Sequence, residues 1–353
     1  MSTRKAEDLT IALDAMGGDR APEVVLAGAQ IARIRHPGVR FLLFGDEARI
    51  RPGLRHHKLL SECAEIRHTA EAIGNDARPS VALRQGRGSS MRLAIDAVAS
   101  GEADCIVSAG NTGALMAMAK YALKTLPGID RPAIASFFPT SRGESVILDL
   151  GANVECDPEN LVQFAVMGAV FAKAVLGMSQ PTIGVLNVGA EALKGNEVVK
   201  EAANRLSQIA LPGQFAGFVE GNDIPKGTVD VVVTDGFTGN VALKTAEGTA
   251  SLINEWIRRT FKSSIFAALG YLLARNAFNK LRRRVDPRQY NGAMFLGLRG
   301  ICVKSHGGTD ARGFAHAIDV GVDLVLNGFN KHVAEEVGRY GGEPAAVPAV
   351  GGA

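Results

Sequence analysis

The chain has 353 residues, of which 46% are hydrophobic and 21% are charged, and its formal net charge is only +3. These values indicate a soluble globular protein with a sizeable core. They exclude a disordered chain and one whose overall charge would direct it to nucleic acid. The four cysteines lie far apart without a CxxC pair, so we expect no metal site. A cytoplasmic location is expected, since neither a signal peptide nor a run of about 18 apolar residues is visible.

Short apolar strands alternate with helices through most of the chain. The first strand, at residues 9–13, leads into Asp14-Ala15-Met16-Gly17-Gly18-Asp19, where Asp19 is expected to cap the next helix. Further strands are expected at 40–44, 65–69, 104–108, 133–138, 146–150, 182–186, 215–219 and 229–234, with helices that include 79–85, 90–99 and 159–176. This alternation predicts a Rossmann-like α/β fold, with a largely parallel sheet covered by helices on both faces.

The pattern predicts one α/β catalytic domain over residues 1–340. The tail over 341–353 is expected to be disordered, because it consists mainly of Gly, Ala, Val and Pro with little charge. Ligands of parallel sheets gather at the carboxyl ends of the strands. We therefore expect the polar and glycine-rich turns that follow several strands to converge on one site.

Two strand-to-helix turns share the pattern Asp, an aliphatic run, Ser or Thr, any residue, Gly, any residue, Thr-Gly. The first glycine turn is Ser108-Ala109-Gly110-Asn111-Thr112-Gly113, and the second is Thr234-Asp235-Gly236-Phe237-Thr238-Gly239. Glycine lets the backbone approach a ligand closely, and a helix N-terminus offers free N–H groups. The pair therefore predicts an anion site, with phosphate as the natural ligand. The alternative is that both are ordinary turns of an α/β protein.

A long helical segment at about 250–286 interrupts the alternation. Its middle, at 265–273, is dense in apolar side chains and is surrounded by basic residues. We expect two helices that form a hairpin with the apolar part near its tip. Such a hairpin suits the interface of an anionic membrane. A dimer interface with a solvated basic face is the alternative, and the two interpretations are compatible.

Several common motifs are absent from the sequence. There is no GxGxxG after the first strand, no Walker A sequence, no GxSxG and no HExxH. The segment His306-Gly307-Gly308-Thr309-Asp310 is one residue shorter than the His-x4-Asp signature of glycerolipid acyltransferases. It is therefore interpreted as a glycine turn before the last helix, with His306 near the ligand.

Five ordered motifs together resemble the PlsX family, the phosphate acyltransferases of bacterial phospholipid synthesis. They are Asp14 to Asp19 with Ala21-Pro22, Ser108 to Ala114, Asp149 to Asn153, Asn187-Val188-Gly189 with Glu191 and Lys194-Gly195-Asn196, and Asp235 to Asn240. The resemblance implies transfer of a fatty acyl group from acyl carrier protein to inorganic phosphate. It also implies a homodimer with a core like those of phosphate acetyltransferases and isopropylmalate dehydrogenases. Peripheral membrane contact is implied, with the acyl phosphate passing to a membrane glycerol-3-phosphate acyltransferase of the PlsY type.

The resemblance supports Lys194 as the essential cation and Asn240 as the amide donor to the carbonyl oxygen. Lys194 would neutralise phosphate or the oxyanion, or protonate the leaving thiolate. No cofactor or metal is expected. Asp14, Asp19 and Asp235 are expected to orient Lys194 or to cap helices. The substrate-binding candidates are Gly110, Asn111, Thr112, Gly113, Asn153, Gly236, Phe237, Thr238, Gly239 and His306.

Two other functions compete with this one. A dehydrogenase of the isopropylmalate type would share the fold, but it would need a nucleotide site and metal-binding aspartates. A membrane-associated scaffold that only binds phosphate lipids would need fewer polar turns than the sequence contains. Because the carrier protein is acidic in this kind of pathway, Arg78, Arg84, Arg87, Arg92 and the hairpin arginines are candidates for steering it.

Overall fold

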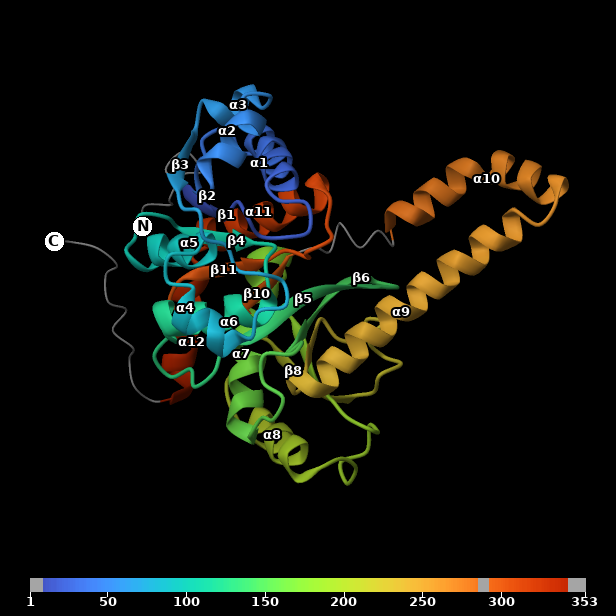
Figure 1. Ribbon diagram of the computed structural model, residues 1–353. Helices are drawn as coiled ribbons and strands as arrows, with labels where there is room; N and C mark the ends of the chain where they lie inside the picture. The colour runs from blue at the N-terminus through green and yellow to red at the C-terminus, as the bar shows by residue number, and fades with distance from the viewer. Residues whose placement is uncertain (1–8, 285–291, 342–353) are drawn as a thin grey trace.

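A computed structural model describes residues 9–284 and 292–341. In these ranges eleven strands form one sheet in the order β3-β2-β1-β4-β11-β10-β5-β6-β9-β7-β8 (Figure 1). The strands are β1 (Thr10–Asp14), β2 (Arg40–Gly45), β3 (Ala64–His68), β4 (Cys105–Ser108), β5 (Ala133–Thr140), β6 (Gly143–Leu148), β7 (Thr182–Leu186), β8 (Gln214–Val219), β9 (Val231–Val233), β10 (Ala293–Leu296) and β11 (Ile301–Lys304).

The sheet consists of two parallel blocks that run in opposite directions. Strands β3, β2, β1, β4 and β11 are mutually parallel, and so are β6, β9, β7 and β8. The blocks are joined by antiparallel pairing of β11 with β10, β10 with β5 and β5 with β6. The predicted, largely parallel α/β sheet is confirmed. Strands β10 and β11 were not predicted, although β11 lies in the middle of the sheet.

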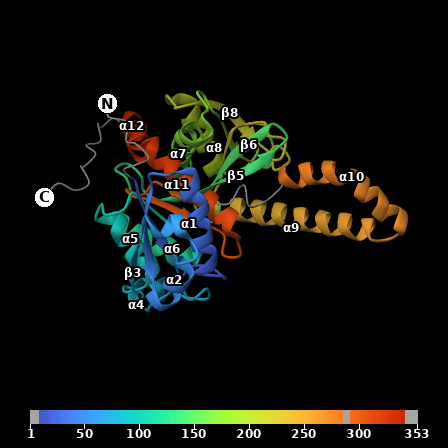
Figure 2. The ribbon, with the colours of Figure 1, turned by 90° about the horizontal axis from the view of Figure 1, so that it is seen from above.

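Helices cover both faces of the sheet, as predicted (Figure 2). In β1, Ile11 and Leu13 face the core beneath α1, α7 and α11, whereas Ala12 faces the core beneath α5 and α6. This is the two-residue period of a strand buried on both sides. The helices are α1 (Glu23–Arg35), α2 (Glu47–Leu54), α3 (Lys58–Ser61), α4 (Pro79–Gln85), α5 (Ser90–Ala99), α6 (Thr112–Leu123), α7 (Pro158–Leu176), α8 (Glu197–Gln208), α9 (Gly236–Phe261), α10 (Ile265–Arg284), α11 (Ala311–Leu326) and α12 (Phe329–Gly341).

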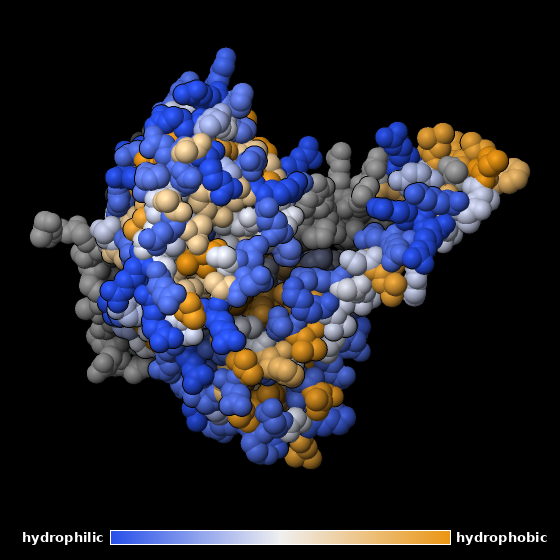
Figure 3. Space-filling view, in the orientation of Figure 1, coloured by the Kyte–Doolittle hydropathy of each residue, from blue (hydrophilic) through white to orange (hydrophobic). Residues whose placement is uncertain are grey.

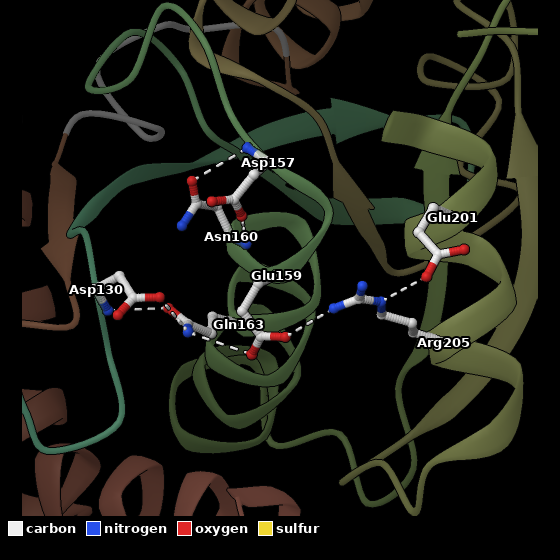
Figure 4. A network of polar contacts seen from close by, with 7 residues as sticks. All are labelled: Asp130, Asp157, Glu159, Asn160, Gln163, Glu201 and Arg205. Carbon is white, nitrogen blue, oxygen red and sulfur yellow. Dashed lines mark hydrogen bonds and ion pairs between the residues drawn. The ribbon is translucent and has the colours of Figure 1, made fainter. Parts of the chain in front are cut away.

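Polar contacts fix the start of the central helix α7 (Figure 4). Asp157 and Asn160 form a reciprocal capping box, which satisfies N–H groups that the first turn leaves open. On the same turn, Glu159 pairs with Arg205 of α8 at 3.3 Å. Gln163 donates to Asp130 at 2.9 Å. By length and apolar composition, α7 is the one helix of the described residues that could cross a membrane, but 72% of that window is buried inside this fold.

The predicted helical hairpin is present, although it begins much earlier than residue 250. Helix α9 runs without interruption from the second glycine turn to Phe261, and α10 returns from Ile265. Near the tip, Phe261, Tyr271 and Phe278 pack together with ring centroids 4.9–5.4 Å apart. Apolar side chains cover the outside of the tip, above a more hydrophilic stem (Figure 3). Those that are exposed on α10 are Ile265, Phe266, Leu269, Tyr271, Leu272 and Leu273.

Two predictions about chain ends and caps have different outcomes. Of the tail predicted at 341–353, Gly341 is the last residue of α12, contrary to the prediction, and residues 342–353 lie outside the described residues. The predicted cap of α1 by Asp19 is wrong, because the helix begins only at Glu23 and its N-cap, Pro22, makes no side-chain hydrogen bond. The Asp19 carboxylate instead accepts a hydrogen bond from Asn75 at 3.1 Å.

Candidate active site

The turns after six strands gather into two clusters. The Asp14 cluster contains residues 14–19 after β1, 108–113 after β4 and 304–308 after β11. The Asp149 cluster contains residues 149–153 after β6, 187–194 after β7 and 235–240 after β9. Within each cluster the three strands are parallel neighbours, so their carboxyl ends lie at the same edge. Among the described residues, no hydrogen bond or ion pair joins the two glycine turns directly.

A buried carboxylate organises the first cluster. Asp14 is 1% exposed, and its two oxygens accept hydrogen bonds from the hydroxyls of Ser90 at 2.6 Å and Ser108 at 2.7 Å. The Ser108 hydroxyl in turn accepts the N–H of Gly110 at 3.0 Å. Burial raises the pKa of the Asp14 carboxyl, and the two hydroxyl hydrogen bonds oppose that shift. A Cβ on Gly17 would lie 2.5 Å from Asp14 Oδ2 and 2.7 Å from Gly110 N, so this close approach requires glycine.

A buried lysine lies in the same cluster. Lys304 is the last residue of β11, and its Nζ donates to the carbonyl oxygens of Ala109, at 3.4 Å, and Ser305. Burial lowers the pKa of this ammonium group to about 8, while the nearby carboxylates Asp14 and Asp19 act in the opposite direction. Lys304 was not among the residues predicted from the sequence. The available signal was a lysine directly after the apolar run 301–303, in a strand that was itself not predicted.

The first glycine turn keeps three backbone donors open. The Asn111 side chain caps α6 by accepting from Ala114 N at 2.9 Å, and its amide group donates to the carbonyls of Asn75 and Ala77. Within the described part of the chain, the N–H groups of Asn111, Thr112 and Gly113 have no acceptor. The predicted anion cradle is therefore available as backbone, whereas the Asn111 side chain is occupied by internal contacts.

His306 belongs to the rim of the Asp14 cluster. It is exposed, and its Nδ1 accepts the N–H of Gly308 at 3.1 Å. The neighbouring Gly307 carbonyl accepts the N–H of Asp19 at 3.0 Å, which ties this loop to the loop after β1. The glycine turn that the sequence predicted at 306–310 is thus present, although two helices, α11 and α12, follow it instead of one.

A second buried carboxylate organises the other cluster, but through backbone groups. Asp149 is fully buried and accepts the N–H groups of Ile134, Gly151, Ala152 and Asn153 at 2.6–3.2 Å. The Asn153 side chain also donates to Asp149, at 2.9 Å, and to the Pro132 carbonyl. Burial raises the pKa of Asp149, against these hydrogen bonds. Both amide hydrogens of Asn153 are therefore used internally, so these hydrogens are not open to the expected substrate contact.

The second glycine turn is closed by its own neighbours. Gly236 N donates to the Asn153 carbonyl at 2.7 Å, and Gly239 N donates to the Asp235 carbonyl at 3.0 Å. Asp235 caps α9 as predicted, accepting both the backbone N–H and the hydroxyl of Thr238 at 2.8 Å. Of the backbone groups at 236–239, only the N–H of Phe237 lacks an acceptor among the described residues. The predicted phosphate cradle of backbone N–H groups is therefore not available in this turn.

Lys194 and Asn240 instead provide exposed side-chain donors in the Asp149 cluster. Lys194 is exposed and pairs with Glu191 at 3.1 Å, not with Asp14, Asp19 or Asp235, so its orientation by those aspartates is not observed. This contact contributes to the lowered pKa of Glu191. Asn240 is exposed over Gly151, and its side-chain amide has no partner within the described ranges.

Neither a reactive thiol nor a metal centre is found near the two clusters among the described residues. Burial, together with the nearby Asp149 and Asp235, raises the pKa of the Cys156 thiol to about 12, so this thiol stays protonated at neutral pH. No group of three or more His, Cys, Asp or Glu in the part of the chain that the structure describes could hold a metal ion. The arrangement therefore offers an open row of backbone donors in one cluster and a cation with an amide in the other.

Solved structures first define the class of fold. The chain resembles a phosphotransacetylase from Streptococcus pyogenes with a TM-score of 0.60 at 17% identity, over 91% of this chain and 95% of that one. It also resembles the EutD phosphotransacetylase from Staphylococcus aureus with a TM-score of 0.57 at 16% identity, over 93% and 95% of the two chains. The fold is thus that of the phosphotransacetylases. At these identities, the likeness shows the fold alone.

Sequence comparisons then define the family. The family model described as "Fatty acid synthesis protein" matches residues 9–332. Phosphate acyltransferase of Rhodospirillum centenum is 67% identical over 95% of this chain and 94% of its own length. That of Rhodospirillum rubrum is 59% identical over 97% and 98%. The chain therefore belongs to this family of enzymes, the PlsX phosphate acyltransferases.

Proposed function

We propose that the protein transfers a fatty acyl group from acyl carrier protein to inorganic phosphate and releases acyl phosphate for phosphatidic acid synthesis. The family and its named relatives support phosphate as the acyl acceptor. The places proposed for phosphate and for the acyl thioester rest on one observation, which is that the two clusters offer different hydrogen-bond donors. The Asp14 cluster offers backbone N–H groups, and the Asp149 cluster offers the side chains of Lys194 and Asn240. The open N–H row suits a small oxyanion such as phosphate. A cation and an amide suit the carbonyl oxygen of a thioester.

The proposed chemistry needs positioning more than deprotonation. Phosphate is already anionic at neutral pH, so one of its oxygens can attack the thioester carbonyl carbon directly. The new C–O bond forms, the C–S bond breaks, and the sulfur leaves with the electron pair of that bond. Asn240 donates to the carbonyl oxygen as negative charge develops there. The Lys194 ammonium stabilises the same charge and supplies a proton to the leaving thiolate.

The acyl carrier protein is proposed to dock beside α4. Arg78, Arg84 and Arg87 are exposed there, and α4 adjoins the first glycine turn, since a Cβ on Gly113 would lie 2.7 Å from Pro79. An acidic carrier protein would be steered towards these cations. Arg92, also a candidate from the sequence, is less suited, because it is bound by Asp96 at 2.8 Å and lies over the Tyr121 ring.

The hairpin is proposed to contact an anionic membrane, and the protein is proposed to form a homodimer in the cytoplasm. Phe266 and Leu273 are 86% and 89% exposed, and Arg258, Lys262 and Arg275 are exposed around them. Exposed apolar side chains with a basic rim suit anionic lipid. The side chains of the basic residues later in α10, Lys280 and 282–284, are not described. A membrane acyltransferase of the PlsY type is the proposed consumer of the product.

One assay tests the reaction. The protein is incubated with acyl carrier protein thioester and phosphate, and hydroxylamine then converts acyl phosphate to acyl hydroxamate. We expect hydroxamate that depends on both substrates, and its absence with a correctly folded protein would overturn the proposal. Because a 4-hydroxythreonine-4-phosphate dehydrogenase from Salmonella typhimurium shares the fold at a TM-score of 0.53, an NAD(P)H fluorescence titration completes the test. Saturable nucleotide binding would favour a dehydrogenase.

A further inference from the structure

The least expected charged group in the molecule is Lys304, which lies beneath the first glycine turn. It is only 9% exposed, and lysine is rarely buried to this degree unless it is paired. An ammonium group has three N–H donors. The described residues accept two of them, through the carbonyls of Ala109 and Ser305, and make no ion pair with Lys304 within 4 Å. A buried cation with a spare donor is therefore held next to a turn whose backbone N–H groups are open.

Lys304 and Asp14 hold this turn from two sides. Asp14 fixes the Ser108 hydroxyl, which accepts the Gly110 N–H. Lys304 holds the Ala109 carbonyl, which belongs to the same peptide group as that N–H. Both polar ends of the 109–110 peptide are thus occupied, so its orientation is fixed. The three N–H groups that follow it are left as the open donors.

The lysine also changes the electrostatics of the turn. A buried carboxylate beneath an anion site would repel the anion, because little water screens it. Lys304 is close enough to Asp14 and Asp19 for their charges to raise its pKa against the effect of burial. With Lys304 protonated, the buried charge of Asp14 is compensated, and the one other carboxylate that acts on Lys304 among the described residues, Asp19, is exposed to water and accepts a hydrogen bond from Asn75.

We propose that Lys304 is the positioning residue of the phosphate site: it orients the first glycine turn, balances the charge of Asp14 and so lets inorganic phosphate bind at Asn111, Thr112 and Gly113. This inference rests on the proposed function for its ligand. It assigns phosphate to the Asp14 cluster, and it leaves the acyl thioester to Lys194 and Asn240.

The central test is Lys304→Met, which keeps the length of the side chain and removes its charge and donors. We expect the KM for phosphate to rise about 10- to 100-fold, the range for loss of a charge-assisted hydrogen bond. The KM for the acyl carrier protein thioester and the kcat at saturating phosphate should stay close to wild type. Lys304→Arg should recover part of the loss. Lys120→Met, on the exposed face of α6, is the matched control and should behave as wild type.

The Ser108→Ala variant and phosphate calorimetry test the same inference independently. If Lys304→Met does not fold, Ser108→Ala removes the acceptor of the Gly110 N–H and should raise the same KM. Calorimetric titration with inorganic phosphate tests binding without turnover. Weaker phosphate binding in the variants, with no turnover in wild type, would overturn the proposed reaction and leave the phosphate site standing. An unchanged phosphate KM, or an equal rise in both KM values, would overturn the role of Lys304.

Discussion

The two glycine turns share a sequence pattern but differ in what they offer a ligand. In the first, the side chain of Asn111 caps α6 and the N–H groups at 111–113 stay open. In the second, the Asn153 carbonyl and Asp235 occupy nearly all the N–H groups at 236–239. The difference arises partly from Asp235, which stands in the second turn where the first has Ala109, and partly from the carboxylate behind each turn. Asp14 binds hydroxyls and leaves the turn's helical end free, whereas Asp149 draws in the 151–153 loop, which closes over α9.

The backbone conformation of such a glycine turn therefore does not determine whether its N–H groups are open to a ligand. Both turns need glycine and both start a helix, so the pattern predicts their shape well. Whether a backbone N–H can bind a ligand depends on distant segments that supply or withhold an acceptor. For the Gly236 N–H that acceptor is the carbonyl of residue 153, which the pattern does not contain, whereas Asp235 within the turn accepts the N–H groups of Thr238 and Gly239. The first turn is expected to act through its backbone and the second through side chains.

The largest expected effect tests the side-chain role of the second cluster. Lys194→Ala should lower turnover about 100-fold or more, as when one oxyanion donor is removed. Lys226→Ala is the matched control, since Lys226 is an exposed lysine paired with Asp223 three residues before it, like Lys194 with Glu191. Steady-state kinetics on the folded proteins measure both. Equal activity of the two variants would remove Lys194 from the mechanism.

The next effect tests how firmly the second turn is closed. A Cβ on Gly239 would lie 2.0 Å from the backbone oxygen of Asp149, so Gly239→Ala must displace the loop and should destabilise the fold by about 1–3 kcal/mol. Gly248→Ala, in the same helix, meets nothing within 4 Å and should stabilise it by about 0.5–1 kcal/mol. Urea denaturation compares the two. A neutral Gly239→Ala would show that the closed turn is not rigid.

A smaller effect concerns how the protonation of Lys304, in the Asp14 cluster, changes the affinity for phosphate. Burial lowers the pKa of Lys304 to about 8, so its charge is present below that pH and is lost above it. Phosphate affinity should therefore fall as pH rises through about 8, and Lys304→Met should lack this dependence. The charged and titratable groups that face Lys304 are Asp14, Asp19 and Cys302. Burial keeps the Cys302 thiol neutral in this range by raising its pKa. Calorimetry at a series of pH values measures the effect, and the same alkaline loss in both proteins would contradict it.

The smallest effect on catalysis is expected far from both turns. Replacing Leu272 and Leu273 by Glu should reduce sedimentation with anionic vesicles, because both side chains are exposed on the hairpin. Turnover with soluble substrates should be unchanged. Vesicles of neutral lipid, tested with the unaltered protein, are the control for the electrostatic part of the binding. Undiminished binding to anionic vesicles, with an altered oligomeric state by light scattering, would make the hairpin a dimer element only.

The sequence predicted the architecture better than the use of individual groups. Alternating strands and helices, the two turns and the apolar hairpin all follow from local pattern. The order of strands does not. The four residues of β11 carry little periodic signal, and β11 lacks the recurring glycine turn that marked the equally short β4. Lys304 was missed with β11. Asn111 and Asn153 were assigned to substrate because they are polar residues in glycine turns. Their side-chain amides donate to the carbonyls of residues 75, 77 and 132, which are distant in sequence, and that of Asn153 also donates to Asp149.

Helix α9 connects the Asp149 cluster to the apolar tip of the hairpin without a break. Its 26 residues form a rod about 39 Å long at about 1.5 Å per residue, and Asn240 is on its second turn. Nothing interrupts the rod between that side chain and the apolar tip. If the tip lay in a lipid headgroup layer, α9 would therefore fix the distance and the tilt of the Asp149 cluster relative to the bilayer. Acyl phosphate would then leave the enzyme roughly 30 Å from the lipid surface, a gap set by the length of one helix.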